Sequence, residues 1–236
     1  MSAGARSGDV AVVIPARDEE DRIQATVTAA AGMAGVALVI VVDDGSNDAT
    51  AAAAQRAGAV VTRHRRNRGK GAAMETGAEA ARVVDHSERR DRPRHLLFLD
   101  ADLADTAAQA GPLIDPVLAG KADMTIAVFS TTVKLGGHGL VVGLSGAGIQ
   151  RATGWRPAQP LNGQRCLTRA AFEAARPIAH GWGAETGLTI DLLRQGFRVT
   201  EVEVDLAHRA TGTGLQAQLH RAHQLADVAR ALAARR

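Results

Sequence analysis

The hydrophobic residues of this chain fall into short, nearly continuous runs separated by stretches of helical character. Residues 9–14 form one such run, which ends at Pro15, and residues 36–42 form a second. Short runs of this kind indicate strands that are covered on both faces, as in a parallel sheet. A third strand is predicted at residues 59–62 and a fourth at residues 95–100.

Helices are predicted between these strands. Residues 19–31 begin with acidic residues, which the helix dipole favours in a first turn. Ser46 or Asp48 can cap a second helix, and a third is predicted from about residue 71 to residue 84, followed by a polar surface connection at residues 85–94. This alternation predicts an α/β domain with a doubly wound, mostly parallel sheet flanked by helices.

The second half of the chain has a different pattern of residues. After a strand near residues 124–128, residues 135–148 are apolar and rich in glycine, and we interpret them as an irregular segment. Order is expected to return with a helix at residues 185–194 and an alternating strand at residues 197–206. Apolar residues at helical spacing predict a last helix over residues 215–234.

Composition narrows the class of protein. A chain of 236 residues with 46% hydrophobic and 22% charged residues is typical of one globular domain rather than of a disordered chain. The longest apolar run, residues 36–42, is far shorter than the ~20 residues that cross a bilayer, and residues 1–9 do not resemble a secretory signal. The single cysteine, Cys166, excludes an intrachain disulfide and a cysteine-rich zinc site, so we expect a cytoplasmic protein.

Basic residues are concentrated in one loop. The net charge is only +3, and just three of the 28 basic residues are lysines. The densest group is Arg63, Arg65, Arg66, Arg68 and Lys70. No aromatic residues alternate with them and no nucleic-acid-binding motif is present, so a solvated loop or a nucleotide diphosphate is favoured over nucleic acid.

Polar motifs follow the predicted strands, at the edge of the sheet where ligands of open α/β sheets bind. Asp100 and Asp102 are one residue apart and suit a hard divalent cation, although a pair of solvated loop acids would have the same pattern. Residues 67–71 (Asn-Arg-Gly-Lys-Gly) offer backbone N–H groups and a cation to a phosphate. Residues 43–46 (Asp-Asp-Gly-Ser) also have the composition of an ordinary turn.

Three other motifs are excluded because each lacks residues that it requires. A Walker A loop requires Ser or Thr after Gly-Lys, whereas Gly71 follows Lys70. The segment after the first predicted strand lacks the glycines of a dinucleotide fingerprint. No Gly-x-Ser-x-Gly nucleophile elbow occurs, although the segment around Ser145 comes near it.

The order and spacing of the motifs resemble family 2 glycosyltransferases with the GT-A fold. The motifs are Val12 to Glu20, Val41 to Ser46, Asn67 to Gly71 and Phe98 to Asp102. Further on, Gly181-Trp-Gly-Ala-Glu185 and Ala207-His-Arg209 resemble dolichyl-phosphate mannose synthases and, more strongly, glucosyl-3-phosphoglycerate synthases. The resemblance implies one GT-A domain over residues 1–236, with a nucleotide-sugar-binding half at 1–130 and an acceptor-binding half at 131–236.

The resemblance also implies a set of site residues. Most would bind the nucleotide sugar, with Asp44 facing the base. Asp102, supported by Asp100, would ligate Mg²⁺ or Mn²⁺ together with His208. The complete nucleotide-sugar set is Pro15, Ala16, Arg17, Glu19, Asp44, Gly69, Lys70, Gly71, Asp100, Ala101, Asp102 and Arg209; Gln164 and Arg165 would face the acceptor, where a plain turn is the alternative.

Glu185 is the candidate catalytic residue. In an inverting enzyme it could deprotonate the acceptor hydroxyl; in a retaining enzyme it would hold hydroxyls of the donor sugar; and without function it would be an acid at a helix N-terminus. Likewise, His208 could be a buried histidine at a strand end. The sequence does not decide among these.

The resulting hypothesis is a metal-dependent hexosyltransferase that uses a UDP-glucose or GDP-mannose type of donor and an acceptor hydroxyl or phosphate. A polyprenyl-phosphate acceptor, reached by peripheral docking of the basic last helix on the inner face of the membrane, is the alternative. The same helix could form a homodimer seam. Rival classes are an Asp-x-Asp phosphatase, disfavoured by Ala104 where Thr or Val is expected, and a noncatalytic nucleotide-sugar or polyanion binder.

Overall fold

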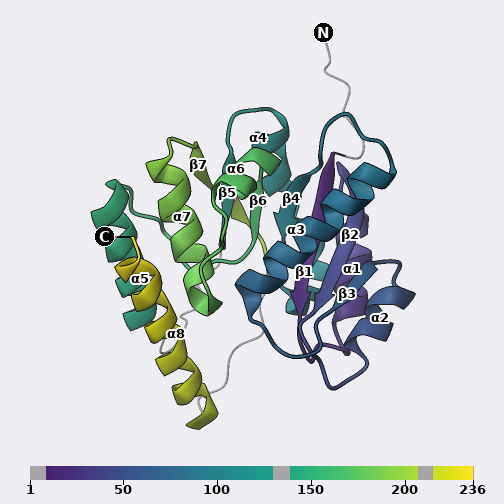
Figure 1. Ribbon diagram of the computed structural model, residues 1–236, viewed down its shortest axis with the longest axis horizontal. Coiled ribbons are helices and arrows are strands. Elements are labelled where there is room, and N and C mark those ends of the chain that lie inside the picture. Colours follow the sequence, from purple (N-terminus) through teal and green to yellow (C-terminus); the bar gives the residue numbers. More distant parts are fainter. Residues whose placement is uncertain (1–8, 130–138, 207–214, 236) are drawn as a thin grey trace.

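The computed structural model describes residues 9–129, 139–206 and 215–235, with the side chains of residues 215–222 excepted. One seven-stranded sheet runs through the molecule (Figure 1) in the order β3-β2-β1-β4-β6-β5-β7. Strand β6 is antiparallel to both neighbours, and every other pairing is parallel. The predicted doubly wound, mostly parallel α/β sheet is therefore confirmed. The strands are β1 (Val10–Ala16), β2 (Val36–Asp43), β3 (Val60–Arg63), β4 (His95–Phe98), β5 (Met124–Phe129), β6 (Arg165–Leu167) and β7 (Val199–Val204).

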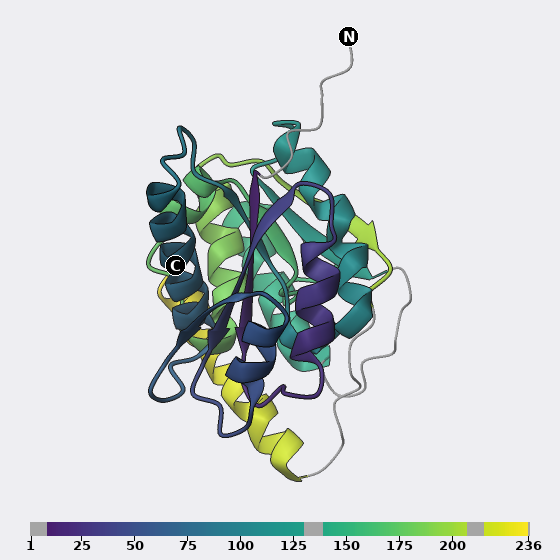
Figure 2. The ribbon, with the colours of Figure 1, turned by 90° about the vertical axis from the view of Figure 1, so that its right-hand side faces the viewer.

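Helices cover both faces of the sheet (Figure 2). Val10, Val12 and Ile14 of β1 pack on one face, with α1 and the stretch after β4, while Ala11 and Val13 pack on the other, with α3. Because alternate side chains are buried on opposite faces, the strand is apolar throughout, which explains the continuous run in the sequence. The helices are α1 (Ile23–Ala31), α2 (Thr50–Arg56), α3 (Lys70–Ser87), α4 (Ile114–Leu118), α5 (Gly139–Thr153), α6 (Arg169–Ala174), α7 (Ala184–Arg194) and α8 (Leu215–Ala233), with two 3-10 stretches, η1 (Ala101–Leu113) and η2 (Gly181–Gly183).

The first helix begins later than predicted. Residues 19–21 precede α1 instead of forming its first turn. The backbone N–H of Glu19 donates to Thr50 Oγ1 (2.8 Å) and that of Glu20 to Asp48 Oδ2 (3.2 Å). These bonds tie the segment to the start of α2, whose N-cap residue is Ala49 and not Ser46 or Asp48 as predicted, although Asp48 accepts from the N–H of Thr50, the first residue of the helix.

The connection at residues 85–94 is not the simple surface segment that its polarity suggested. Helix α3 continues to Ser87, and Asp85 and Arg94 at the two ends are only 5% and 4% exposed. Asp85 accepts from the backbone N–H of Arg94 and from its guanidinium, which also pairs with Glu88. An ion pair formed on folding thus buries charges that the sequence presented as solvated.

The glycine-rich segment was also misjudged. Of residues 135–148, those from Gly139 onward form the first part of helix α5, and residues 135–138 lie outside the described part of the chain. A Cβ on Gly148 would lie 2.4 Å from Leu232 Cδ2, so this glycine permits close packing of α5 on α8. The sequence reading also missed the short elements η1, α4, β6 and α6.

Helix α3 depends on one glycine for its packing on the sheet. A Cβ on Gly77 would lie 2.2 Å from Val13 Cγ1 and 3.2 Å from Val42 Cγ2. We expect Gly77→Ala to lower the free energy of unfolding by about 1–2 kcal/mol, because overpacking outweighs the helix propensity of alanine. The matched control is Gly111→Ala, where a Cβ would meet nothing within 4 Å. Equal stability of the two variants in chemical denaturation would contradict this packing.

Candidate active site

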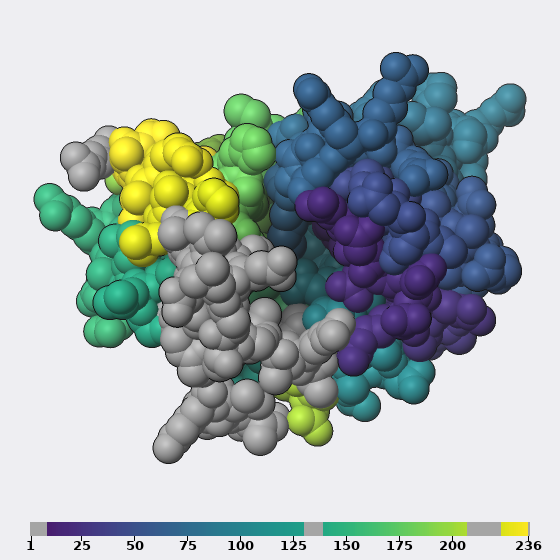
Figure 3. Space-filling view, turned by 90° about the horizontal axis from the view of Figure 1, so that it is seen from below, coloured from purple at the N-terminus to yellow at the C-terminus, as the bar shows by residue number. Residues whose placement is uncertain are grey.

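The predicted motifs gather at one edge of the sheet, where β1, β2 and β4 end and β6 begins. Because β6 is antiparallel to β4, with Arg165 opposite Phe98, its first residues lie beside the residues that follow β4. Figure 3 looks onto this edge and shows a hollow beside the N-terminal half of the chain, with teal residues at its floor. Ligands of open α/β sheets bind at such an edge.

Hydrogen bonds join the loops that follow β1 and β2. The Asp44 N–H donates to Ala16 O (2.8 Å), and the Asp18 N–H donates to Ser46 Oγ (3.0 Å). Asp18 has a φ of 54°, a left-handed conformation that this cross-loop bonding holds in place. The segment from Pro15 to Glu19, predicted to line the nucleoside pocket, is therefore fixed relative to the loop after β2.

Asp44 organises the glycine-containing loop before α3. Its carboxylate accepts from the backbone N–H groups of Arg68 (2.8 Å) and Gly69 (2.8 Å), and it is only 6% exposed. His64 Nδ1 lies 2.6 Å from the same carboxylate, and His64 Nε2 lies 2.9 Å from Thr76 Oγ1. The contact of Asp44 with a base remains a prediction, whereas its support of the loop is a feature that the sequence did not reveal.

The two glycines of Gly69-Lys-Gly71 are required by geometry. Gly69 has a φ of 88°, and a Cβ on Gly71 would lie 2.5 Å from Ala179 O. Helix α3 begins at Lys70, so its first N–H groups lie beside this tight turn. A helix N-terminus with a lysine in its first turn is suited to an anionic group such as a diphosphate.

Lys70 connects two predicted carboxylates. Its ammonium lies 2.7 Å from Asp100 Oδ1 and 2.9 Å from Glu185 Oε1. Burial by itself would lower the pKa of Lys70, but Asp100 and Glu185 together raise the pKa above its ordinary value. Glu185 is 2% exposed, and its Oε2 accepts no hydrogen bond from the described residues. A buried carboxylate oxygen without a donor suggests that a ligand supplies one.

Gln164 and Arg165, predicted to face an acceptor, lie inside the protein. Both are fully buried. Gln164 Nε2 donates to Asp100 Oδ2 (2.7 Å), so its amide orients a predicted metal-supporting acid. The adjacent Gly163 leaves room for Lys70, since a Cβ there would lie 2.2 Å from Nζ.

Arg165 does not fit the predicted acceptor contact. Its guanidinium donates to the backbone oxygens of Pro160, Asn162 and Glu185 and to Thr189 Oγ1, so its donors are used inside the protein. Burial lowers the pKa of Arg165 to about 10, although the nearby Glu185 and Glu201 act in the opposite direction. The residue fixes the start of α7, which carries Glu185.

The predicted metal ligands are only partly described. Asp100 and Asp102 follow β4, and the backbone oxygen of Asp102 accepts from Arg22 Nη1 (3.2 Å). Among the described residues no group of three or more His, Cys, Asp or Glu side chains could hold a metal ion. His208 and Arg209 lie outside the described residues. Carboxylate oxygens and an imidazole nonetheless form a donor set that suits Mg²⁺ or Mn²⁺.

A basic rim of exposed arginines follows β1 and β3 at this edge of the sheet. Arg17, Arg65, Arg66 and Arg68 are exposed, and Arg63 pairs with Asp43 (3.0 Å). A pocket opens beside them, lined by Gly45, Ser46, Asn47, Arg63, His64 and Arg65. The rim therefore presents positive charge to an anionic ligand as it approaches.

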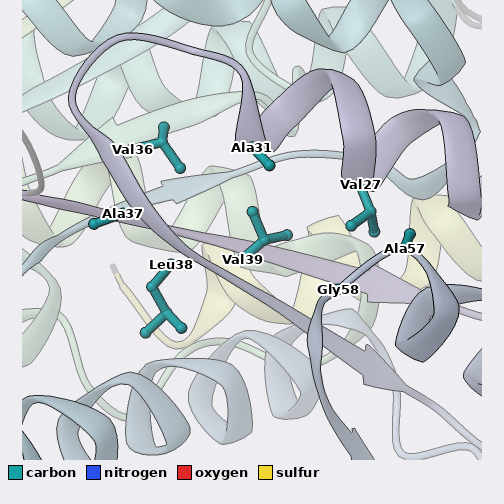
Figure 4. Close-up of a pocket in the computed structure, with 8 residues that line it drawn as sticks. All are labelled: Val27, Ala31, Val36, Ala37, Leu38, Val39, Ala57 and Gly58. Atoms are coloured by element: carbon teal, nitrogen blue, oxygen red, sulfur yellow. The ribbon is translucent and has the colours of Figure 1, made fainter.

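A second pocket is lined by residues without polar side chains (Figure 4). It is formed by the end of α1, the start of β2 and the end of α2, with no charged residue in its lining. The residues around it are Val27, Ala31, Val36, Ala37, Leu38, Val39, Ala57 and Gly58. It therefore has none of the chemistry of the site at the opposite ends of the strands.

Comparison with known proteins supports the resemblance seen in the sequence. The family model of glycosyl transferase family 2 matches residues 11–139, which is more than half of the chain. The chain belongs to this family. This membership confirms the predicted family, and the matched residues include the loops after β1, β2 and β4 that form the site.

Two curated relatives match different lengths of this chain. An uncharacterized protein of Methanocaldococcus jannaschii is 34% identical over 118 residues, which cover 50% of this chain and 45% of that protein. The glucosyl-3-phosphoglycerate synthase of Mycolicibacterium paratuberculosis is 28% identical over 214 residues, which cover 81% of this chain and 62% of that enzyme. The chain thus spans less than two thirds of either relative.

Solved structures confirm the predicted GT-A fold. Glucosyl-3-phosphoglycerate synthase of Mycobacterium tuberculosis, solved with phosphoglyceric acid, has a TM-score of 0.75 and 24% identity, covering 97% of this chain and 80% of that one. A structure of the same enzyme with Mn²⁺, UDP-glucose and phosphoglyceric acid has a TM-score of 0.71 and 25% identity, covering 96% and 80%. Among the residues that the structure describes, no helix is long and apolar enough to cross a membrane.

The ion pairs of Lys70 are expected to stabilise the folded protein, which can be tested by substitution. We expect Lys70→Met to lower the free energy of unfolding by about 2 kcal/mol, because Glu185 loses its buried cation while the 21% exposure of Lys70 moderates the loss. Because the pKa of Lys70 is raised in the folded state, this stabilisation is fully present at neutral pH. It is lost only when the pH rises above the unfolded-state pKa of about 10.4 and through the folded-state pKa.

The comparison uses denaturant titrations near neutral pH, where this stabilisation is fully present. Lys121→Met, which removes an exposed lysine, is the control and should leave stability unchanged. The double variant Lys70→Met/Glu185→Gln should lose less than Lys70→Met alone, since it no longer buries an unpaired charge. Simple additivity of the two single substitutions would contradict the bridge.

Proposed function

We propose that this chain transfers a hexose from a UDP-sugar, in the presence of Mn²⁺ or Mg²⁺, to a small phosphorylated acceptor of the phosphoglycerate kind. The observation that carries the proposal is the Lys70 bridge between Asp100 and Glu185, built at the ligand edge of a family 2 sheet. Relatives with the same fold bind UDP-glucose, Mn²⁺ and phosphoglyceric acid together.

The loop before α3 is suited to the diphosphate. Gly69 and Gly71 allow the loop to turn tightly against residues 178–181, and Lys70 at the helix start supplies a cation. Asp102 and His208 would hold the metal ion, supported by Asp100, whose two carboxylate oxygens accept from Lys70 and Gln164. When bound, such an ion would neutralise charge that develops on the departing diphosphate.

Glu185 is assigned to the sugar side of the site. Its carboxylate is buried beside Lys70 and retains an oxygen without a donor among the described residues. That oxygen could accept from the acceptor hydroxyl in an inverting reaction or from a donor-sugar hydroxyl in a retaining one. The anomeric configuration of the product, read by NMR, distinguishes the two roles.

Calorimetric titration tests the donor class. The protein is titrated with UDP, UDP-glucose, GDP and GDP-mannose, each with Mn²⁺ and with EDTA. Binding of the uridine ligands only with Mn²⁺ is expected. Metal-dependent binding of the guanosine ligands alone would overturn the donor assignment, and no binding of any of them would overturn the proposal.

The acceptor is tested separately. Transfer to 3-phosphoglycerate is compared with transfer to a polyprenyl phosphate in detergent micelles, with one donor and one metal. We expect product from 3-phosphoglycerate. Transfer only to the polyprenyl phosphate would favour the alternative in which the protein acts at a membrane surface.

The metal assignment predicts the effect of Asp102→Asn. Loss of a carboxylate ligand should weaken metal-dependent UDP binding by about 10- to 100-fold, which corresponds to about 1.4–2.7 kcal/mol, because the metal ion that contacts the diphosphate is held less tightly. Asp105→Asn, which changes an exposed acid in the same segment, should bind normally. Titration with UDP and Mn²⁺ measures both variants, and normal binding by Asp102→Asn would remove this residue from the metal site.

The sugar-side assignment predicts a different result for Glu185→Gln. Donor affinity should stay within about twofold of wild type, while kcat falls about 100-fold or more, as for loss of an acid or base group. Initial rates over a range of donor concentrations separate the two parameters. The control is Glu203→Gln, an exposed glutamate on β7. An unchanged kcat in Glu185→Gln would exclude Glu185 from the reaction.

A further inference from the structure

The C-terminal helix α8 contacts the turn that precedes Glu185. In Figure 1 the yellow helix lies beside α5 and near α7, and α8 also packs against η2 (Gly181–Gly183). Helix α7 begins at Ala184, immediately after this turn, and Glu185 is its second residue. The orientation of the turn therefore determines where the Glu185 side chain begins.

The backbone of the turn and the carboxylate of Asp227 fit closely. The Trp182 N–H donates to Asp227 Oδ2 (3.2 Å). Gly181 has a φ of 56°, and a Cβ there would lie 2.0 Å from Asp227 Oδ2. A Cβ on Gly183 would lie 2.7 Å from Ala231 Cβ and 2.8 Å from Asp227 O. Both glycines of Gly-Trp-Gly are thus required by the close approach of α8.

A second attachment holds α8 along α7. Arg235 Nε donates to Asp191 Oδ1 (2.7 Å), and its Nη2 donates to Asp191 Oδ2. A Cβ on Gly187 would lie 2.9 Å from the Arg235 guanidinium carbon. With Asp227 at the turn and Arg235 just after the end of α8, this part of the chain is fixed at two separate points to α7 and the turn before it.

We propose that Asp227 is a positioning residue for Glu185. Its carboxylate fixes the Trp182 N–H and thereby the turn from which α7 begins, so that Glu185 lies beside Lys70. The proposal rests on the transfer activity proposed above. It assigns α8 a role in the reaction, in addition to its packing on α5.

Hydrogen–deuterium exchange and kinetics together test this role. In Asp227→Ala, exchange at the Trp182 amide should accelerate, and kcat should fall about tenfold with donor KM within about twofold, as for loss of a hydrogen bond to a charged group. Asp227→Asn keeps an acceptor oxygen and should recover most of both. Arg230→Ala, which removes the 73% exposed partner of Asp227, should behave as wild type.

Several outcomes would overturn the proposal. Unchanged Trp182 exchange in Asp227→Ala would show that the contact does not hold the turn. Faster exchange with an unchanged kcat would show a structural contact without a role in turnover. If Asp227→Ala does not fold, Asp227→Asn decides, because a tenfold loss of kcat in a folded variant that retains Trp182 protection contradicts positioning through this hydrogen bond.

The two proposals can fail separately. If the wild-type protein transfers no sugar with any donor and acceptor, the proposed function fails, and the role of Asp227 in turnover fails with it. Trp182 exchange still shows whether Asp227 holds the turn. If the wild type is active and the Asp227 variants match it in kcat and exchange, only the positioning proposal is lost.

Discussion

Lys70 stands between two carboxylates that come from distant parts of the chain. Asp100 follows β4, whereas Glu185 is the second residue of α7, and the ammonium at 2.7 Å and 2.9 Å makes their proximity favourable. Without a cation, two acids facing one partly buried hollow would repel each other. Several neighbouring features serve this arrangement. Gly163 leaves space for Nζ, and Gln164 holds the second oxygen of Asp100.

The antiparallel direction of β6 is what brings these neighbours together. A parallel strand at that position would have placed its carboxyl end at the ligand edge and left residues 163–165 at the opposite one. With β6 reversed, Gln164 reaches Asp100, and Arg165 lies beneath the site, bonded to the Glu185 backbone. Gln164 and Arg165 thus hold Asp100 and the backbone of Glu185 in place. This role explains why both polar residues are buried although they lie next to a hollow.

The sequence predicted the first half of the fold better than the second for a physical reason. Strands β1 and β2 are covered on both faces, so their residues are continuously apolar and easily recognised. Strand β6 has three residues, too few to show any period. Helix α5 contains glycines that normally interrupt helices, and its stability comes from contact with α8, a partner that local sequence does not reveal. The same limit applied to the site: motif residues were found, but the supporting roles of His64, Gln164 and Asp227 depend on contacts between distant segments.

The arginine-rich loop shows how one segment can act on a ligand in two ways. Asp44 binds the backbone N–H groups of Arg68 and Gly69, which fixes the loop whatever its side chains do. The side chains of Arg65, Arg66 and Arg68 are therefore left exposed at the rim. Exposed charges are screened by salt and mainly raise the rate at which an anion arrives, whereas a fixed turn and helix N-terminus act on the bound anion. Because Asp44 holds the backbone of the loop, the arginine side chains can speed the arrival of an anion, while the position of the backbone that binds the anion does not depend on them.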